Sequence, residues 1–312
     1  LKMDTSRRDA LRRAISEYDA QGWHRTGTDV DNRSADWLCA CLRARRIDGQ
    51  VVQLPFDRFE PGAATLVTRD LHLDGLPMFD GGTTPHGGIR GRLGPIGSDA
   101  LIGVTVGRPN AATEELREAR EDGRHAVIVT VSHDGQSGLA VTNATRYDRP
   151  YGPPVLQLGS EHHEVVSALC EGKAEAKVTV LGLRVPATAS NVVGYIPGRD
   201  PSLSPIVLMT PRSGWWHCAS ERGTGIACWL ETADTARRMG LQRDVYLVAS
   251  TGHELGFWGM HRFMETADAR VLDAALWVHF GASIGAAVNP RAMFAASTEP
   301  LRKLTAAMAA EA

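Results

Sequence analysis

The pattern of apolar and polar positions predicts strands and helices that alternate along the chain, as in an α/β protein. Short apolar runs typical of buried strands lie at 206–209, 244–250 and 274–280, and a further strand is expected at 50–56. Amphipathic helices are expected at 4–19, 34–45 and 226–239, because apolar residues recur there every three or four positions. Strands that alternate with helices of this length indicate right-handed crossover connections, and hence a mainly parallel or mixed sheet.

The middle of the chain has a different pattern. From about Pro61 glycine and proline become frequent, and short β-type runs alternate with turns at 64–67, 101–106, 126–131, 155–158 and 177–181. Two helices are expected among them, at 113–120 and 161–169. The pattern predicts a β-rich domain, 61–185, inserted into an α/β domain made of 1–60 and 186–312. After residue 279 we expect only a strand at 292–296 and a helix at 300–310.

Composition narrows the class of protein. The chain has 312 residues, is 43% hydrophobic and 22% charged, and carries a net charge of −2, which is ordinary for a globular protein and gives no reason to expect nucleic acid or an anionic membrane as a partner. No apolar run approaches the roughly 20 residues of a membrane span. Five cysteines, an odd number, argue against a disulfide framework and favour a cytoplasmic location. Because the chain begins at Leu1 and not at a methionine, secretion after removal of a leader peptide is a second possibility.

Residues that bind metals follow the three predicted strands of the later α/β portion. His217 and Glu221 come after 206–209, the pair His253-Glu254 comes after 244–250, and His279 ends 274–280. In an open α/β sheet, ligands bind beyond the carboxyl ends of parallel strands. We therefore place the candidate site at these three strand ends.

The order of these features resembles the co-catalytic zinc aminopeptidase family, which includes bacterial leucyl aminopeptidases, glutaminyl cyclases and the transferrin-receptor ectodomain. The resemblance rests on the loop and helix at 24–42, T-A-S-N-V-V-G-Y-I-P-G at 188–198, G-T-G-I-A-C-W-L-E-T-A at 223–233 and G-H-E-L-G-F-W-G at 252–259. It implies a three-layer α/β sandwich of the zinc-aminopeptidase type, a protease-associated-like insert at 61–185, and hydrolytic ancestry.

The ligand pattern of that family is altered here. Pro211 and Ser213 stand where the family has the His and Asp of its H-x-D motif, and Glu221 stands at the bridging Asp. His253 replaces the Glu that acts as general base in the family, whereas Glu254 retains the second Glu, a zinc ligand.

The end of the chain also departs from the family. His279 falls near the later Asp, and the family's final His has no counterpart, since no histidine follows residue 279. The chain is short for this family. Either the sequence is incomplete at its end or a partner chain supplies the missing part, and a homo-oligomer is compatible with the second case.

Two interpretations of the altered pattern remain. In the first, His217, Glu221 and His279 hold one divalent metal ion (zinc, iron or manganese), with Glu254 as a fourth ligand or a partner that orients a ligand. His253 then acts as the catalytic acid or base, because the pKa of imidazole lies close to working pH. The chain would be a metal-dependent hydrolase of a peptide-like or small amide- or carbonyl-bearing substrate.

In the second interpretation the chain is a catalytically inactive peptidase homologue that serves as a binding or assembly module. Arg222 stands beside the bridging carboxylate, and a guanidinium there would neutralise the pocket. Under either interpretation the candidates for substrate binding are Arg222 and four residues of the neighbouring loops: His24, Arg25, Trp215 and Trp216. The alternative, purely structural roles are a surface salt bridge for Arg25 and packing for the tryptophans.

One motif suggests a different reaction. The G-x-S-x-G sequence at 281–285 follows a predicted strand, as in the nucleophile elbow of α/β-hydrolases. That triad needs an Asp and then a His after the serine, and no histidine follows. We read the segment as a turn at a strand end.

Overall fold

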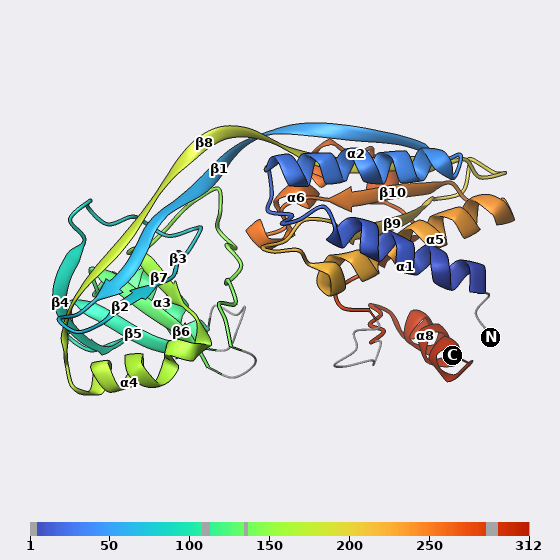
Figure 1. Ribbon diagram of the computed structural model, residues 1–312. Helices are drawn as coiled ribbons and strands as arrows, with labels where there is room; N and C mark the ends of the chain where they lie inside the picture. Colours follow the sequence, from blue (N-terminus) through green and yellow to red (C-terminus); the bar gives the residue numbers. More distant parts are fainter. Residues whose placement is uncertain (1–4, 108–112, 134–136, 285–292, 312) are drawn as a thin grey trace. The chain divides into compact units, whose positions relative to one another are not determined.

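The computed structural model describes residues 5–107, 113–133, 137–284 and 293–311 (Figure 1). The chain divides into two compact units. The first unit consists of 1–54, 188–253 and 259–312, and the second of 55–187 and 254–258. Each has its own buried core.

The first unit is built on a mixed sheet. β9 (Ile206–Pro211) pairs in parallel with β10 (Val245–Ser250) on one side and with β11 (Leu276–His279) on the other. β8 (Glu175–Ile196) runs antiparallel to β10, and β1 (Asp48–Val67) pairs with β8. The three parallel strands are those that the apolar runs predicted, and their ends agree with the prediction to within two residues.

Helices cover both faces of this sheet. On one face lie α1 (Thr5–Asp19), α2 (Asp29–Ala44) and α5 (Thr224–Met239), whose apolar side chains form one core with β8, β9 and β10. At its centre the indole Nε1 of Trp229 donates to the Leu208 carbonyl oxygen at 2.9 Å. On the other face α6 (Trp258–Thr266) and α7 (Ala269–Leu272) pack against Val207 and Val248. The predicted three-layer α/β sandwich is confirmed.

The second unit contains further strands and two helices. β4 (Ile89–Pro95), β5 (Ile102–Gly107), β6 (Val127–Ser132) and β7 (Val155–Leu158) pair in parallel in that order, and β3 (Leu76–Pro77) is antiparallel to β7. β2 (His72–Asp74) pairs with β1. α3 (Glu114–Asp122) and α4 (His163–Glu171) complete the unit, and three-residue turns lie at Ser160–His162 and His253–Leu255. Alternate residues of the strands build its core, including Val129, Leu156 and Val178.

Several elements differ from the prediction. The run expected at 177–181 is part of the long strand β8, which continues to Ile196, and β1 extends well past the predicted 50–56. α2 begins at Asp29 rather than at 34 because Thr28 caps it, its side chain accepting from the Asp31 N–H at 3.3 Å. Residues 293–296 form no strand, and residue 292 of that predicted strand lies outside the described residues.

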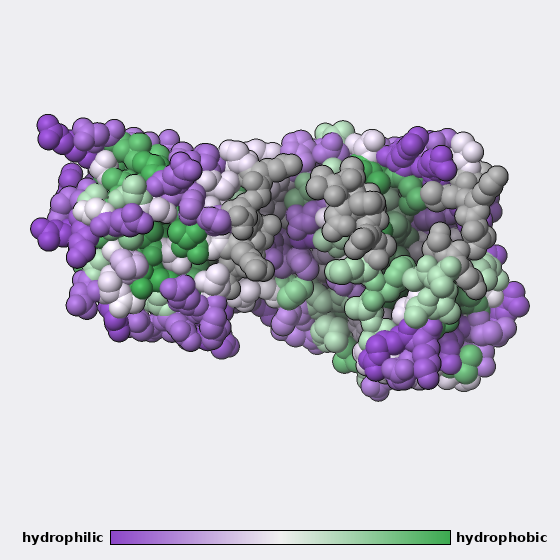
Figure 2. All heavy atoms as spheres, turned by 90° about the horizontal axis from the view of Figure 1, so that it is seen from below, coloured by the Kyte–Doolittle hydropathy of each residue, from purple (hydrophilic) through white to green (hydrophobic). Residues whose placement is uncertain are grey.

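The C-terminal helix α8 (Glu299–Glu311) agrees with the predicted 300–310. Its Leu304 and Met308 are exposed, and apolar patches interrupt the hydrophilic surface of the molecule in the view of Figure 2. Among the helices that the structure describes, none combines the length and the apolar character needed to cross a membrane.

Candidate functional site

The carboxyl ends of β9 and β10 lie side by side in the first unit, since Pro211 is in register with Ser250. The Arg212 N–H donates to the Ser250 carbonyl at 2.9 Å just beyond the strands. The Gly252 N–H then donates to the Ser213 hydroxyl at 2.7 Å and to the Thr26 hydroxyl at 3.1 Å. Hydrogen bonds therefore join the two strand-end loops to the loop before α2.

A buried ion pair fills the space beneath these loops. Arg212 Nη1 and Asp31 Oδ1 are 2.9 Å apart, and both side chains are fully buried. The other carboxylate oxygen, Oδ2, accepts from the Gly27 N–H at 2.9 Å and from the Thr251 hydroxyl at 3.0 Å. Burial raises the pKa of Asp31, while Arg212 and these hydrogen bonds oppose that shift. The pair therefore fixes the position of the strand-end loops.

A second arginine, Arg222, is also buried, with 2% of its side chain exposed. It lies in the wide helical turn Ala219–Gly223 that leads into α5. Its Nε donates to the Ser213 carbonyl at 2.7 Å, and its Nη2 lies 2.8 Å from Glu221 Oε1. The carboxylate at the family's bridging position is thus paired with a guanidinium of the same turn.

Two imidazoles of the first unit lie in the electrostatic field of Arg222. Burial, the positive charge of Arg222 and the neighbouring His279 together lower the pKa of His253 to about 4, and burial contributes most. Burial and then Arg222 lower the pKa of His279 as well. Both side chains are consequently neutral at pH 7, and each offers one N–H donor and one nitrogen acceptor.

The four predicted metal ligands do not form a cluster. His217 is half exposed, and its Nδ1 lies 3.2 Å from Asp19 Oδ1. Glu221 pairs with Arg222, and Glu254 is fully buried in the short turn after β10, where its carbonyl accepts from the Ala144 N–H at 2.8 Å. Across the described parts of the chain no three His, Cys, Asp or Glu side chains are placed to hold a metal ion.

A zinc centre needs three or four such ligands converging on one point. The donor set that the structure describes at the strand ends therefore does not fit the zinc site that the family resemblance implies. The positive charge at the strand ends belongs to the buried guanidinium groups of Arg212 and Arg222, which are paired with Asp31 and Glu221. Asp19 lies against the imidazole of His217, and Arg222 is paired with the carboxylate of Glu221.

The residues predicted to bind substrate are mostly packed. His24 is buried and stacks on Tyr18, with ring centroids 3.7 Å apart, and its Nδ1 is 3.0 Å from the His217 carbonyl. Burial lowers the pKa of His24 to about 4. Trp215 is buried, and Trp216 packs edge-to-face on Trp23 at 5.0 Å.

Arg25 lies in the loop before α2. It is partly exposed, and its carbonyl accepts from the Thr28 hydroxyl at 2.7 Å, which ties the backbone of the loop to the start of α2. The role of Arg25 toward a ligand stays a prediction. The G-x-S-x-G motif adds no site, because Ser283 lies in a turn after β11 with its N–H on the Ser220 carbonyl, and Gly285 lies outside the described residues.

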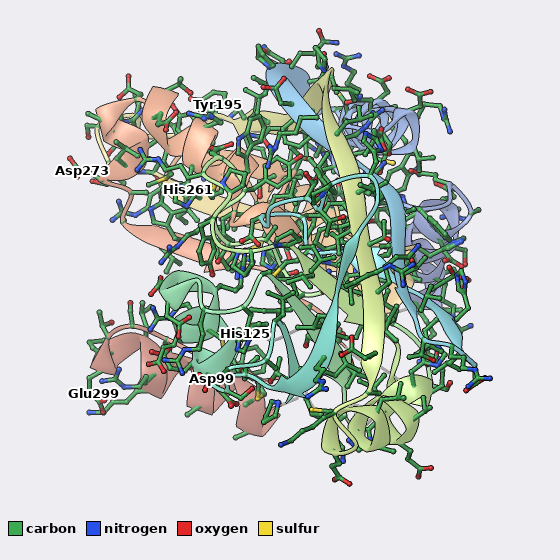
Figure 3. All side chains as sticks on the ribbon, turned by 90° about the vertical axis from the view of Figure 1, so that its left-hand side faces the viewer. Asp99, His125, Tyr195, His261, Asp273 and Glu299 are labelled. Carbon is green, nitrogen blue, oxygen red and sulfur yellow. The ribbon has the colours of Figure 1, made fainter. Side chains whose placement is uncertain are left out.

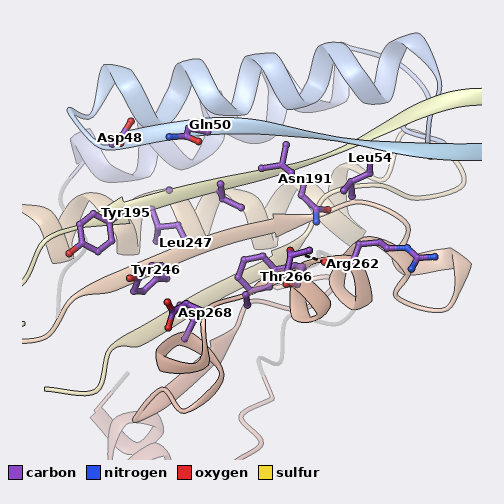
Figure 4. Close-up of a pocket in the computed structure, with 16 residues that line it drawn as sticks. Asp48, Gln50, Leu54, Asn191, Tyr195, Tyr246, Leu247, Arg262, Thr266 and Asp268 are labelled. Atoms are coloured by element: carbon purple, nitrogen blue, oxygen red, sulfur yellow. Dashed lines mark hydrogen bonds between the residues drawn. The ribbon is translucent and has the colours of Figure 1, made fainter. Parts of the chain in front are cut away.

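A cavity of about 320 Å³ opens on the sheet of the first unit, away from the predicted residues (Figure 4). β1 contributes Asp48 and Gln50, and the segment after α6 contributes Asp268. The rings of Tyr195 on β8 and Tyr246 on β10 lie 5.1 Å apart at its wall. None of the site residues expected from the sequence lines it.

Comparison with known proteins identifies the fold. A zinc aminopeptidase from Bacillus subtilis, BSAP, superposes with a TM-score of 0.67 at 16% sequence identity over 87% of this chain and 68% of that one. An aminopeptidase from Aneurinibacillus sp. strain AM-1 gives 0.65 at 13% identity, over 87% and 69% of the two chains. A peptidase M28 precursor from Shewanella amazonensis gives 0.64 at 15%, over 87% and 72%. The fold is that of the zinc aminopeptidases.

At this level of identity the likeness establishes the aminopeptidase fold alone, since one fold carries many functions. No protein-family model matches the sequence, and no curated protein matches it.

Sequence reasoning missed the residues that dominate those strand ends. Asp31 reads as an ordinary acidic residue in the first turn of a helix, and Arg212 as part of a polar loop. They are 181 positions apart, and nothing in the pattern of either segment pairs them. A basic residue directly after a buried strand was the one available signal.

Proposed function

We propose that this chain is a metal-free protein of the aminopeptidase fold that binds a peptide-like ligand without hydrolysing it. The observation that carries this proposal is the position of Arg222, buried, paired with Glu221 and close enough to lower the pKa of both His253 and His279. A divalent ion among these side chains would face a fixed guanidinium charge at short range, which is strongly unfavourable in a buried site.

The same groups suit a polar or anionic ligand. A guanidinium binds carboxylates, and neutral imidazoles can both donate and accept hydrogen bonds. The terminal carboxylate or the amide groups of a peptide-like molecule match this set. The fold thus serves as a scaffold for recognition, and the ancestral chemistry is lost with its ligands.

One observation favours the second candidate, a hydrolase with a rebuilt mononuclear metal site. His253 and His279 are both held neutral, which is the form of imidazole that ligates metals. Glu221 keeps about half of its side chain exposed. Zinc, iron or manganese bound by such groups could be retained if Arg222 moved away from Glu221.

Metal content separates the two candidates. The purified chain is incubated with zinc, desalted and analysed for metals, and hydrolysis of leucine p-nitroanilide is measured with and without a chelator. We expect well below one metal ion per chain and no chelator-sensitive hydrolysis. His279→Ala and His72→Ala are the matched pair, because His72 is exposed in the second unit. One zinc per chain that is lost in His279→Ala but retained in His72→Ala would establish the hydrolase instead.

A further inference from the structure

The cavity on the sheet of the first unit lies on the face where α6 and α7 pack (Figure 4). Those two helices cover Val207 of β9 and Val248 of β10, and β8 and then β1 continue the sheet beyond β10. Val52 of β1 lines the cavity and is 38% exposed. The volume of about 320 Å³ falls in the range of pockets that bind small molecules. The cavity shares no residue with the strand-end site.

Two tyrosines from neighbouring strands form an aromatic wall of this cavity. Tyr195 of β8 is in register with Tyr246 of β10, and the two rings are tilted by 56° with their centroids 5.1 Å apart. Tyr195, labelled in Figures 3 and 4, also forms a hydrogen bond with the buried carboxylate of Asp244, which fixes its ring. Val193 and Phe263 extend the lining with apolar side chains. The cavity therefore offers a preformed aromatic and apolar surface.

Two carboxylates line the cavity without a cationic partner. Asp48 lies beside β8, one residue from Tyr195, since a Cβ on Gly194 would lie 3.1 Å from the Asp48 carbonyl oxygen. Asp268 caps α7, where its Oδ1 accepts from the Arg270 N–H at 2.8 Å. Within the described parts of the chain neither aspartate side chain forms an ion pair, and both are exposed. Their negative charges are therefore not neutralised by the protein.

The arginines near the cavity already have acidic partners. Arg262 lines it, and its Nη1 lies 2.8 Å from Glu265 Oε2. In the view of Figure 4 Arg262 lies at the other end of the cavity from the two tyrosines. Arg270 does not line the cavity, and its Nη1 lies 2.8 Å from Asp244 Oδ2. Because these two pairs balance, the two unpaired carboxylates give the tyrosine end a net negative charge.

We propose that this cavity binds a small organic ammonium ion with an apolar body. The cationic head lies against the rings of Tyr195 and Tyr246 and faces the carboxylates of Asp48 and Asp268. Aromatic rings attract cations through their quadrupole, and a carboxylate adds a charge-assisted hydrogen bond when the head is a primary ammonium. The apolar body fills the remaining space against Phe263. An anionic ligand would instead meet two like charges.

A ligand-observed NMR titration of the whole chain at low salt tests the proposal. The probe is phenethylamine, a cation at neutral pH as alkyl amines are. Two molecules of similar shape are the comparisons, 2-phenylethanol without charge and phenylacetate with a negative charge. We expect phenethylamine to bind about tenfold more tightly than the alcohol, because only the cation gains from the rings and the carboxylates. Phenylacetate should bind more weakly than either.

Variants at the charged end of the cavity localise the site. Asp48→Asn should weaken the binding of phenethylamine roughly three- to fivefold, the effect of losing one exposed opposite charge. Asp36→Asn is the matched control, because Asp36 is an exposed carboxylate of α2 that does not line the cavity, and it should change the affinity by less than about twofold.

A second pair of variants tests the aromatic wall. Tyr246→Leu should weaken the binding of phenethylamine roughly three- to fivefold, whereas Tyr246→Phe should retain it because the ring remains. If Tyr246→Leu does not fold, the comparison of Asp48→Asn with Asp36→Asn still decides the question.

Any of three results would overturn the proposal. The first is no binding of phenethylamine. The second is an equal affinity for the alcohol or for phenylacetate, which would leave an apolar pocket without selectivity for a cation. The third is an equal effect of Asp48→Asn and Asp36→Asn, which would leave only the overall charge of the protein as the cause.

Discussion

Buried arginines give the strand ends of the first unit their character. Arg212 is fully buried and Arg222 nearly so, and each is held by an acid and by backbone carbonyls. Such pairs contribute little net stability as wholes, but removing one partner leaves the other as an uncompensated charge. The network is therefore sensitive to the loss of any one member.

Asp31→Ala should lower the free energy of unfolding by about 3–5 kcal/mol, because Arg212, Gly27 and Thr251 all lose the acceptor that satisfies them. Equilibrium urea unfolding followed by circular dichroism measures the change. Asp36→Ala, on the exposed face of the same helix, is the control and should stay within about 0.5 kcal/mol of the parent. Equal stability of the two variants would contradict a structural role for the buried pair.

His24 predicts a dependence of stability on pH. Its folded pKa of about 4 lies below the ordinary value of 6.5, so between these values the unfolded chain binds a proton that the folded chain does not. The contribution of this group to stability is complete above pH 6.5 and falls as the pH drops toward 4, by on the order of 3 kcal/mol. His24→Phe, which keeps a ring on Tyr18, should flatten that fall in urea titrations, whereas exposed His72→Gln should not. A slope unchanged in His24→Phe would exclude the assignment.

The side-chain pairings at this scale were beyond sequence reasoning. Proximity between Asp31 and Arg212 depends on the whole path of the chain between them, and single-residue patterns carry no record of it. Arg222 was recognised as a neutralising neighbour of Glu221 because the two are adjacent in the sequence, and that local pairing is present.

At the scale of helices and strands, local patterns were sufficient. The period of apolar residues located α1, α5, β9 and β10 because each buries one face or lies wholly in a core. The predicted bounds were wrong where a helix cap or the continuity of a strand sets the end of an element. The examples are Thr28 before α2 and the length of β8. Apolar runs show which residues are buried. A strand can nevertheless continue across partly exposed residues, because its backbone hydrogen bonds to the neighbouring strand continue there.

The start of α5 carries a steric prediction. A Cβ on Gly225 would lie 2.5 Å from the Gly281 carbonyl oxygen, so the chain after β11 passes against a bare helix backbone. Gly225→Ala gains about 1 kcal/mol of helix propensity but forces the two backbones apart, at a cost of about 1–3 kcal/mol. We expect a net loss of stability in urea unfolding. Met239→Ala, at an exposed position of the same helix, is the control and should leave the stability nearly unchanged. An increase in stability of Gly225→Ala would contradict the prediction, because it would show that the two backbones separate at no cost.

At the scale of the whole molecule, the sequence indicated a three-layer α/β fold with a region of different texture between its parts. The strand order could not be read from it, because β8 pairs with β10 and β4 through different residues of one long strand. Nor could it indicate that β4 to β7 would run in parallel within the second unit. Such pairings depend on how crossovers pack, and composition does not determine that.

The thiols give a prediction for the entire chain. All five cysteines are free, and Cys39 and Cys41 lie two positions apart on α2, where side chains point to different sides. Burial raises the pKa of four of them: Cys39, Cys41, Cys170 and Cys228. Thiolate is the reactive form, so Ellman's reagent should react slowly with native protein and quickly with five thiols per chain in urea without reductant. Fewer than five in urea would reveal a bridge.

The ion pair between Asp31 and Arg212 also bears on the order in which the chain can fold during synthesis. Arg212, which pairs with Asp31, and Thr251, which donates to it, leave the ribosome after the segment 55–187 has emerged. At synthesis rates of about 5–20 residues per second, that segment alone takes roughly 7 to 27 seconds. The apolar faces of α1 and α2 therefore remain exposed while the second unit forms its own core. A nascent chain halted near residue 187 should be a client of chaperones at its beginning and already protease-resistant in its middle.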